Sequence, residues 1–114
     1  MTALLATDHS RTIAHLNDQA RQSFQHCRVH ITPGIHSLSP STVQQVLRAV
    51  QSFNRFDARD DPYGEHDFGR LSVAGHEVFW RFDYYDLDLE MASLDPADET
   101  VTARVLTIML AEEY

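Results

Sequence analysis

The segment His76–Asp86 constrains the fold most, because its side chains alternate between two faces along its whole length. One face would carry Val78, Trp80, Phe82 and Tyr84, and the other Glu77, Phe79, Arg81, Asp83 and Tyr85. A period of two is typical of a β-strand, and large residues on both faces favour a central strand of a sheet. The preceding segment Phe68–Val73 also predicts a strand, and Ala74-Gly75 between the two indicates a tight hairpin.

The first half of the sequence predicts two amphipathic helices joined by a short strand. In residues 10–25 the apolar side chains recur at intervals of three and four, at Ile13, Leu16, Ala20 and Phe24. We expect Ser10 or Asp8 to cap this helix, and its polar side chains to face water, namely Arg11, Asn17, Asp18 and Arg21. Residues 27–32 alternate like a strand, and a second helix is predicted from Ser39-Pro40 to near Phe53.

The last third of the sequence predicts one more strand and one more helix. Leu87, Leu89 and Met91 alternate with acidic residues and indicate a fourth strand. Asp95-Pro96 is typical of a helix start, and the following apolar positions predict a helix that buries Val101, Val105 and Ile108. We therefore predict one α+β domain over residues 1–114, with a small antiparallel sheet of three or four strands packed against about three helices.

The chain is acidic, and its carboxylates are unevenly distributed. Seventeen carboxylates and nine arginines give a formal net charge of −8, and thirteen of the carboxylates lie between Asp57 and Glu99. A concentrated negative field repels nucleic acid and attracts cationic surfaces. We therefore expect a basic protein partner, no direct binding of nucleic acid and no membrane binding. The carboxylates expected to contact that partner are Asp60, Asp61, Asp88, Glu90, Glu112 and Glu113.

A second hypothesis concerns the polar loop that precedes the hairpin. Its run Asp60–Asp67 places four carboxylates and one histidine close together, and such groups can bind a divalent cation or act as general acids and bases. The residues of this alternative are Glu65, His66, Asp67 and Asp83. No established metal motif is present, consecutive residues of a strand point in opposite directions, and Asp and Gly also supply ordinary turns. The catalytic residues therefore stay unassigned, and we expect no cofactor.

The cysteine content and the hydropathy of the sequence indicate where in the cell the protein works. Cys27 is the single cysteine, which excludes an intrachain disulfide and a multi-cysteine metal site. No apolar run approaches the length of a membrane span, and the first ten residues lack the basic and apolar regions of a signal peptide. We therefore expect a cytoplasmic protein, while the oligomeric state stays open.

Four segments of the chain carry a family resemblance, namely Asp60–Gly69, Phe79–Asp86, Asp95–Asp98 and Val105–Tyr114. Together they resemble the signature segments of an uncharacterised bacterial family, domain of unknown function 3768, over nearly the whole chain. Where that family has Trp-Lys-Ile-Asp-Tyr-Tyr-Asp, this chain has Trp80-Arg81-Phe82-Asp83-Tyr84-Tyr85-Asp86, a change that preserves the charge. The resemblance supplies no established catalytic residues.

The resemblance also implies a plasmid or other mobile element as the setting, where small acidic proteins that blunt host defence are common. The favoured hypothesis is therefore an acidic interaction protein that inhibits a bacterial defence nuclease as a DNA mimic, in anti-restriction or anti-CRISPR activity. The alternative hypothesis is a small metal-assisted enzyme, and a third possibility is a subunit whose acidic face meets an adjacent domain in an operon partner. The first two hypotheses differ in whether the carboxylates spread across a surface or converge in a pocket.

Overall fold

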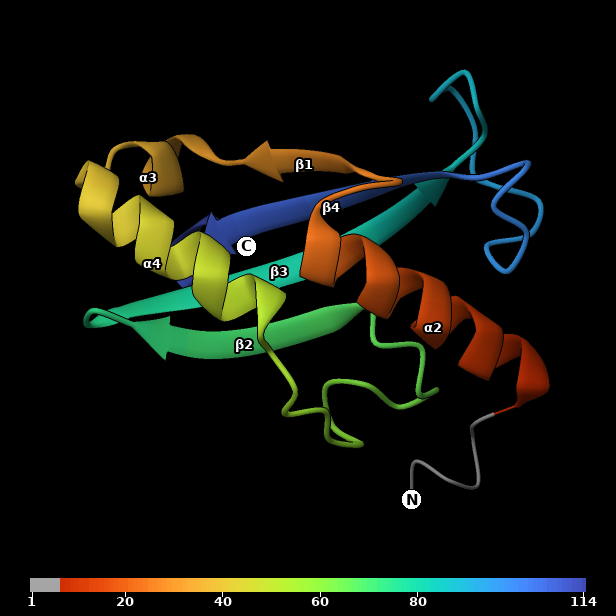
Figure 1. The fold of residues 1–114 in the computed structure, drawn as a ribbon, viewed down its shortest axis with the longest axis horizontal. Coiled ribbons are helices and arrows are strands. Elements are labelled where there is room, and N and C mark those ends of the chain that lie inside the picture. Colours follow the sequence, from red (N-terminus) through yellow and green to blue (C-terminus); the bar gives the residue numbers. More distant parts are fainter. Residues whose placement is uncertain (1–6) are drawn as a thin grey trace.

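The computed structural model describes residues 7–114, and residues 1–6, which belong to the segment compared with a signal peptide, lie outside this range. In chain order the elements are α2 (Asp8–Ser23), β1 (Arg28–Ile31), α3 (Pro33–His36), α4 (Pro40–Gln51), β2 (Phe68–Val73), β3 (His76–Tyr85), β4 (Ala103–Leu110) and the 3-10 helix η1 (Ala111–Glu113) (Figure 1). Within residues 7–114, no helix is long and apolar enough to cross a membrane.

The four strands form one mixed sheet in the order β1-β4-β3-β2. The predicted hairpin is confirmed, because β2 pairs antiparallel with β3 and the turn residues Ala74 and Gly75 have φ angles of 50° and 83°. Strand β4 pairs antiparallel with β3, whereas β1 pairs parallel with β4. The α+β class is therefore confirmed. The sheet is not wholly antiparallel, because α3 and α4 carry the chain from β1 to the opposite edge of the sheet (Figure 1).

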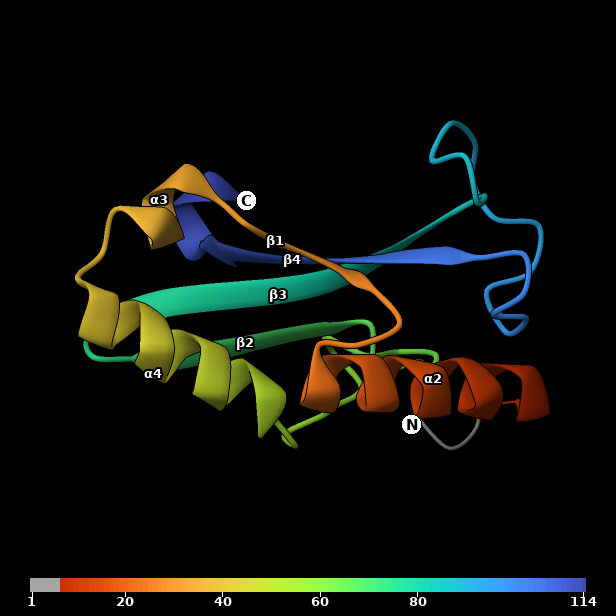
Figure 2. The same cartoon turned by 45° about the horizontal axis from the view of Figure 1, so that its top comes forward.

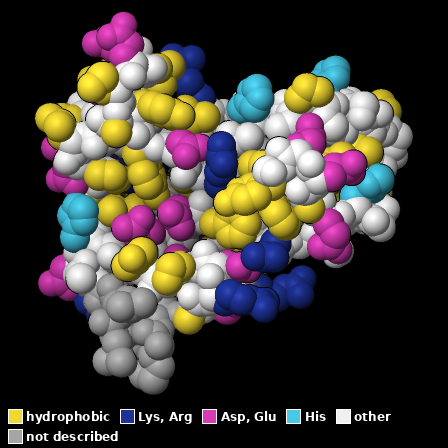
Figure 3. All heavy atoms as spheres, turned by 180° about the vertical axis from the view of Figure 1, so that it is seen from behind, with side chains coloured by type: hydrophobic (Ala, Val, Ile, Leu, Met, Phe, Trp, Pro, Cys, Tyr) yellow, Lys and Arg dark blue, Asp and Glu magenta, His cyan; other side chains and the backbone are white. Residues whose placement is uncertain are grey.

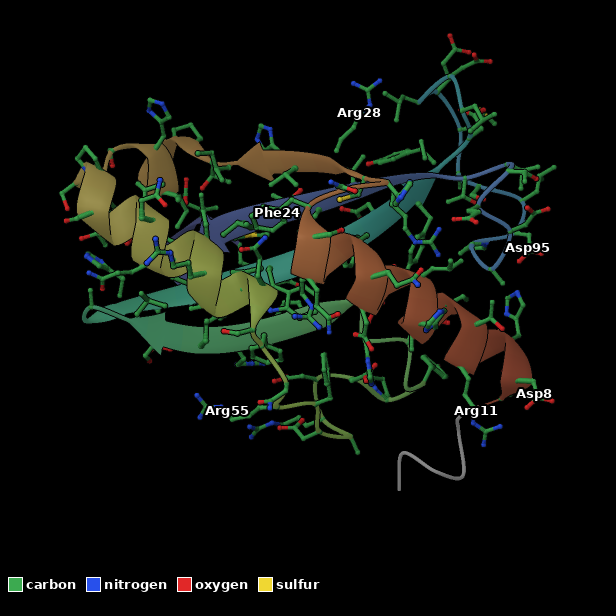
Figure 4. All side chains as sticks on the ribbon, viewed as in Figure 1. Asp8, Arg11, Phe24, Arg28, Arg55 and Asp95 are labelled. Carbon is green, nitrogen blue, oxygen red and sulfur yellow. The ribbon has the colours of Figure 1, made fainter. Side chains whose placement is uncertain are left out.

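Helices α2 and α4 cover one face of the sheet (Figure 2), and within residues 7–114 no helix lies across the other face. The core between helices and sheet contains Val46, Val50, Val78, Trp80, Phe82, Leu106 and Ile108. Phe24, at the end of α2, packs against this core (Figure 4). Gly69 of β2 faces the same layer, and a side chain there would collide with the indole ring of Trp80.

The predicted last helix is wrong, because residues 103–110 form strand β4. Its buried side chains alternate, with Leu106 and Ile108 facing the helices, and Ile108 pairs with Trp80 of β3. The apolar residues of this short run fit the period of a helix as well as that of a strand. The β-branched side chains favour a strand once a partner strand is available. Asp95 accepts a hydrogen bond from the backbone N–H of Ala97, so the predicted helix cap forms a turn instead.

Two further predictions need correction. The segment around Leu87–Met91 forms a turn rather than a strand, and only an isolated bridge joins Tyr85 to Ala92. Helix α2 is capped by Thr7, whose hydroxyl accepts the N–H of Ser10 at 3.0 Å. By contrast, the predicted start of α4 is confirmed, because Ser39 caps the helix and Pro40 occupies its first turn.

Candidate functional site

Asn17 links the loop 54–67, β3 and β4 through side-chain hydrogen bonds. It lies on α2 and is buried, although the helical spacing predicts an exposed position. Its side-chain amide donates to the carbonyl oxygen of Glu65 at 3.0 Å and to the hydroxyl of Tyr84 at 2.8 Å. Its side-chain oxygen accepts a hydrogen bond of 2.9 Å from the buried Arg104 of β4. Asn17 therefore fixes the end of the loop 54–67 against β3 and β4.

Arg21 fixes the start of the same loop and is buried as well, again contrary to the predicted exposure. Its guanidinium donates to the carbonyl oxygens of Val50 at 2.9 Å and Gln51 at 3.1 Å, at the end of α4 where the helix dipole favours a cation. The guanidinium carbon also lies 5.6 Å from the ring centre of Phe56 and 5.1 Å from that of Trp80. These contacts replace part of the water that the cation loses on burial, while Nε of Arg21 has no hydrogen-bond partner within residues 7–114.

His66 is directed toward α2. Its Nδ1 lies 3.0 Å from both carboxylate oxygens of Asp18, its Nε2 lies 3.8 Å from Asp61, and its ring stacks on Phe56 at a centroid distance of 3.8 Å. The hydrogen bond to Asp18 raises the pKa of His66, although burial opposes this change. Burial also disfavours the charge on Asp18, but the hydrogen bonds from His66 and Arg21 outweigh it and lower the pKa of Asp18.

Aspartates form the turns of the loop 54–67. The carboxylate of Asp57 accepts the backbone N–H groups of Arg59 and Asp60, each at 3.0 Å. Asp61 is only 2 % exposed, and its carboxylate accepts the N–H of His66 at 3.1 Å. Burial raises the pKa of Asp61. The expectation that Asp61 is an exposed acid is therefore wrong, because this side chain holds the loop together from within.

A cleft of about 570 Å³ lies between this loop and the sheet. Its lining includes Tyr63, Glu65, Asp67, Phe68, Phe79 and Asp83. Phe68, Phe79, Arg81 and Asp83 belong to the sheet face that the helices leave open, as the strand register requires. Figure 3 shows this face, on which hydrophobic, acidic and arginine side chains lie close together around hollows in the surface.

The charged groups of the cleft differ in their partners. Arg70 donates to both oxygens of Asp60 at 2.9 and 3.0 Å, and Arg81 donates to Asp83 at 3.1 Å. Within residues 7–114, no side chain donates a hydrogen bond to the carboxyl group of Glu65 or Asp67. Burial, reinforced by neighbouring carboxylates, raises the pKa of each of these two groups. The cleft therefore holds two carboxyl groups that the described chain does not pair.

Three residues of the predicted metal site, Glu65, Asp67 and Asp83, share this cleft, and the fourth does not. His66 points to the helix side of the loop, where Asp18 binds it. His66 precedes β2 and has a φ angle of 54°, so its backbone conformation and the hydrogen bond to Asp18, rather than strand alternation, separate it from its neighbours. In the range 7–114, no three His, Cys, Asp or Glu side chains are grouped so that they could hold a metal ion.

The loop from Asp86 to Thr102 joins β3 to β4 and carries six carboxylates and no arginine. Internal hydrogen bonds shape it, since Asp86 accepts the N–H of Glu90 at 3.0 Å and Ser93 bonds to Thr102 at 2.6 Å. Asp95 contacts His9 of α2 at 2.7 Å, and Figure 4 shows Asp95 beside the start of that helix. The guanidinium of Arg104 also donates to the carbonyl oxygen of Pro96. The loop is therefore tied to the body at its base.

This loop leaves several large apolar side chains exposed. Leu94 is 96 % exposed, Met91 69 % and Leu87 63 %. Leu89, at the turn, has a φ angle of 61°, which is costly for a bulky side chain. The two acids predicted to bind a partner here, Asp88 and Glu90, are exposed beside them.

The remaining predicted partner-binding acids lie elsewhere. Glu112 and Glu113 belong to η1, at the opposite end of β4 from the β3–β4 loop (Figure 1). Glu113 accepts hydrogen bonds from the hydroxyl of Thr32 at 2.6 Å and from the N–H of Gly34 and of Leu110 at 2.9 Å each. Its negative charge therefore stabilises the end of the sheet. The six predicted acids do not form one continuous surface.

Sequence reasoning missed the residues that organise the site, Asn17, Asp18 and Arg21. A weak signal was available, because Asp18 and Arg21 stand three residues apart on one helical face and form an ion pair of 3.1 Å. Nothing in the helical pattern shows that this face meets a loop and the core.

Among known proteins, no curated protein and no solved structure matches the chain. The model of one family, described as Protein of unknown function (DUF3768), matches residues 31–113. This range includes α3, α4 and the strands β2, β3 and β4. The resemblance of the sequence segments is thereby confirmed, and the chain belongs to this family.

Proposed function

We propose that the chain is a non-enzymatic interaction protein whose β3–β4 loop binds a basic protein partner. The observation that carries this proposal is the combination, on one loop held by its own hydrogen bonds, of exposed leucine and methionine side chains with six carboxylates. Exposed apolar side chains that gather on one loop are typical of protein interaction sites.

The anatomy of the loop resembles that of an interface. Leu87, Met91 and Leu94 would supply the apolar contact, while Asp88 and Glu90 would lie at its rim. Rim charges act mainly on the rate of association and on the choice of partner. The complementary surface is therefore one that combines an apolar depression with arginine or lysine side chains around it.

The finer proposal is that this partner is a defence nuclease. A nuclease presents a basic surface to DNA, and a carboxylate-rich loop would meet the same surface by charge complementarity. The protein itself should then not bind duplex DNA, because its net charge of −8 repels phosphates.

The test begins with capture of partners from a host lysate, followed by affinity measurements on each purified candidate. Leu94→Ser should weaken binding at least about tenfold, since this apolar side chain is the most exposed one of the loop. The pair Asp88→Asn and Glu90→Gln should reduce the association rate and its salt dependence.

The matched control is Glu112→Gln, which removes an exposed acid at the other end of β4. It should leave affinity unchanged. Binding that is indifferent to salt and to all loop substitutions would contradict the proposal, as would binding of duplex DNA by the protein alone. If a captured candidate is a nuclease, stoichiometric addition of the protein should slow DNA cleavage, and Leu94→Ser should abolish that effect.

The alternative hypothesis, a metal-assisted enzyme, has less geometric support, because His66 does not share the cleft with the three carboxyl groups. Calorimetric titration with zinc, manganese or magnesium tests it. Saturable binding that His66→Ala weakens would favour the enzyme over the interaction protein.

A further inference from the structure

The cleft beside β2 and the β3–β4 loop are separate features. The cleft is lined by residues from the loop 54–67, from β2 and β3 as far as Asp83, and by Tyr114, whereas the β3–β4 loop begins at Asp86. An inference about the cleft therefore does not depend on the function proposed for the loop. What the cleft can bind follows from its unpaired charges and its walls.

Two of the three charged side chains of the cleft that lack an ion-pair partner within residues 7–114 are acidic, Glu65 and Asp67, and the third is the exposed Arg59. Arg70 and Arg81 are each neutralised by a hydrogen-bonded aspartate, so neither offers a free cation to an incoming anion. Glu65 and Asp67, both partly buried, have no side-chain donor within residues 7–114. The carboxyl groups of both residues border the open cleft, and a cationic ligand that supplies N–H groups would form charge-assisted hydrogen bonds with them.

The walls of the cleft are aromatic. Phe68 and Phe79 contact each other edge to face at a centroid distance of 5.4 Å, and Tyr63 lies on the loop side with 59 % of its surface exposed. The faces of aromatic rings attract organic cations. Arg70 already uses these rings, since its guanidinium carbon lies 5.3 Å from the ring centre of Phe79. The chain itself thus shows that the walls accept a guanidinium group.

We propose that this cleft binds an alkyl guanidinium or alkyl ammonium group, with the carboxylates of Glu65 and Asp67 accepting its hydrogen bonds against aromatic walls. An organic cation fits better than a metal ion, because the carboxyl groups of the cleft do not converge as metal ligands within the described chain. The cation is either a free small molecule or the side chain of an arginine or lysine in a peptide.

The experiment follows the amide signals of the protein by NMR during titration with n-butylguanidinium. Signals of residues 65–67 and of β3 should shift and saturate. The neutral isostere n-butylurea should bind at least about tenfold more weakly, a difference of about 1.4 kcal/mol. Two peptides with the same flanking residues, one with arginine and one with the neutral citrulline, identify the source. An arginine peptide that binds more tightly than n-butylguanidinium points to a protein ligand, and equal affinities point to a free cation.

Variants separate this site from the loop. Glu65→Gln and Asp67→Asn should each weaken n-butylguanidinium binding at least about fivefold. Neither should lower the melting temperature, because neither carboxyl group has a side-chain donor to lose, and a melting curve therefore checks that both variants fold. Asp88→Asn, on the β3–β4 loop, is the matched control and should bind the cation like the wild type. Equal binding of n-butylurea, or full binding by both cleft variants, would overturn the inference and leave the proposal for the loop untouched.

Discussion

His66 is the residue whose ionisation acts most directly on the loop 54–67, because Asp18 and Phe56 hold its ring from two sides. The pKa of His66 is raised in the folded protein, so folding favours the protonated ring. Its stabilising contribution is therefore complete below about pH 6.5, the ordinary value, and is lost as the pH rises through the raised value. Asp18 stays ionised over this window, because its own pKa is lowered.

We therefore expect His66→Gln to destabilise the protein by about 0.5–1 kcal/mol more at about pH 5.5 than at about pH 8.5, with allowance for solvent screening of the pair. Urea unfolding at both pH values measures the difference. A smaller loss persists at high pH, because the stacking on Phe56 does not depend on charge. His15→Gln, on the exposed side of α2, serves as the control for loss of an imidazole away from the loop 54–67. Equal losses at both pH values for His66→Gln would mean that the positive charge of His66 contributes nothing to the Asp18 contact.

Strand β4 decides the architecture at the scale of elements, because it joins the hairpin to β1. A helix in this segment would bury Val101 together with Ile108, whereas the strand buries Leu106 and Ile108 and leaves Val101 exposed. Leu106→Ala should therefore cost about 2–4 kcal/mol through lost burial and a cavity. Val101→Ala should cost less than about 0.5 kcal/mol.

Chemical denaturation of the two variants measures these costs, and Ile108→Ala serves as the positive control, since this side chain is fully buried. Equal losses for Val101→Ala and Leu106→Ala would show that the segment packs as a helix. A small loss for all three variants would place the segment outside the core.

Over the whole molecule, acidic side chains occupy several separate places rather than one surface. The acids of the β3–β4 loop and of η1 lie at opposite ends of β4, and Asp57 and Asp60 lie on the loop 54–67. With a net charge of −8 spread in this way, repulsion among the acids opposes folding. Raising the salt concentration from about 0.05 to 0.5 M should therefore raise the melting temperature by about 2–5 °C, because the screening length shortens.

A variant with Asp88→Asn, Glu90→Gln and Glu112→Gln provides the comparison, since these three acids are exposed. Its melting temperature should rise less with salt than that of the wild type. A melting temperature that falls with salt would mean that ion pairs such as Arg70–Asp60 outweigh the repulsion.

The sequence by itself determined the features that depend on neighbours along the chain. The alternation in His76–Tyr85 and the Ala74-Gly75 turn predict the hairpin, because a strand and a two-residue turn are set by local side-chain periodicity and backbone freedom. Ser39-Pro40 likewise predicts the start of α4, since capping involves only residues within one turn. The family membership also rests on the chain's own segments.

Tertiary structure alone decided the features that depend on distant partners. Residues 103–110 form a strand because β3 offers them a hydrogen-bonding edge, which no local pattern reveals. Asn17 and Arg21 are buried because the loop 54–67 and the end of α4 supply acceptors for their donors. His66 turns away from Glu65 and Asp67 because Asp18, 48 residues earlier in the chain, binds its ring. In each case the favourable contact joins segments far apart in sequence, so only the folded arrangement determines which side chains meet.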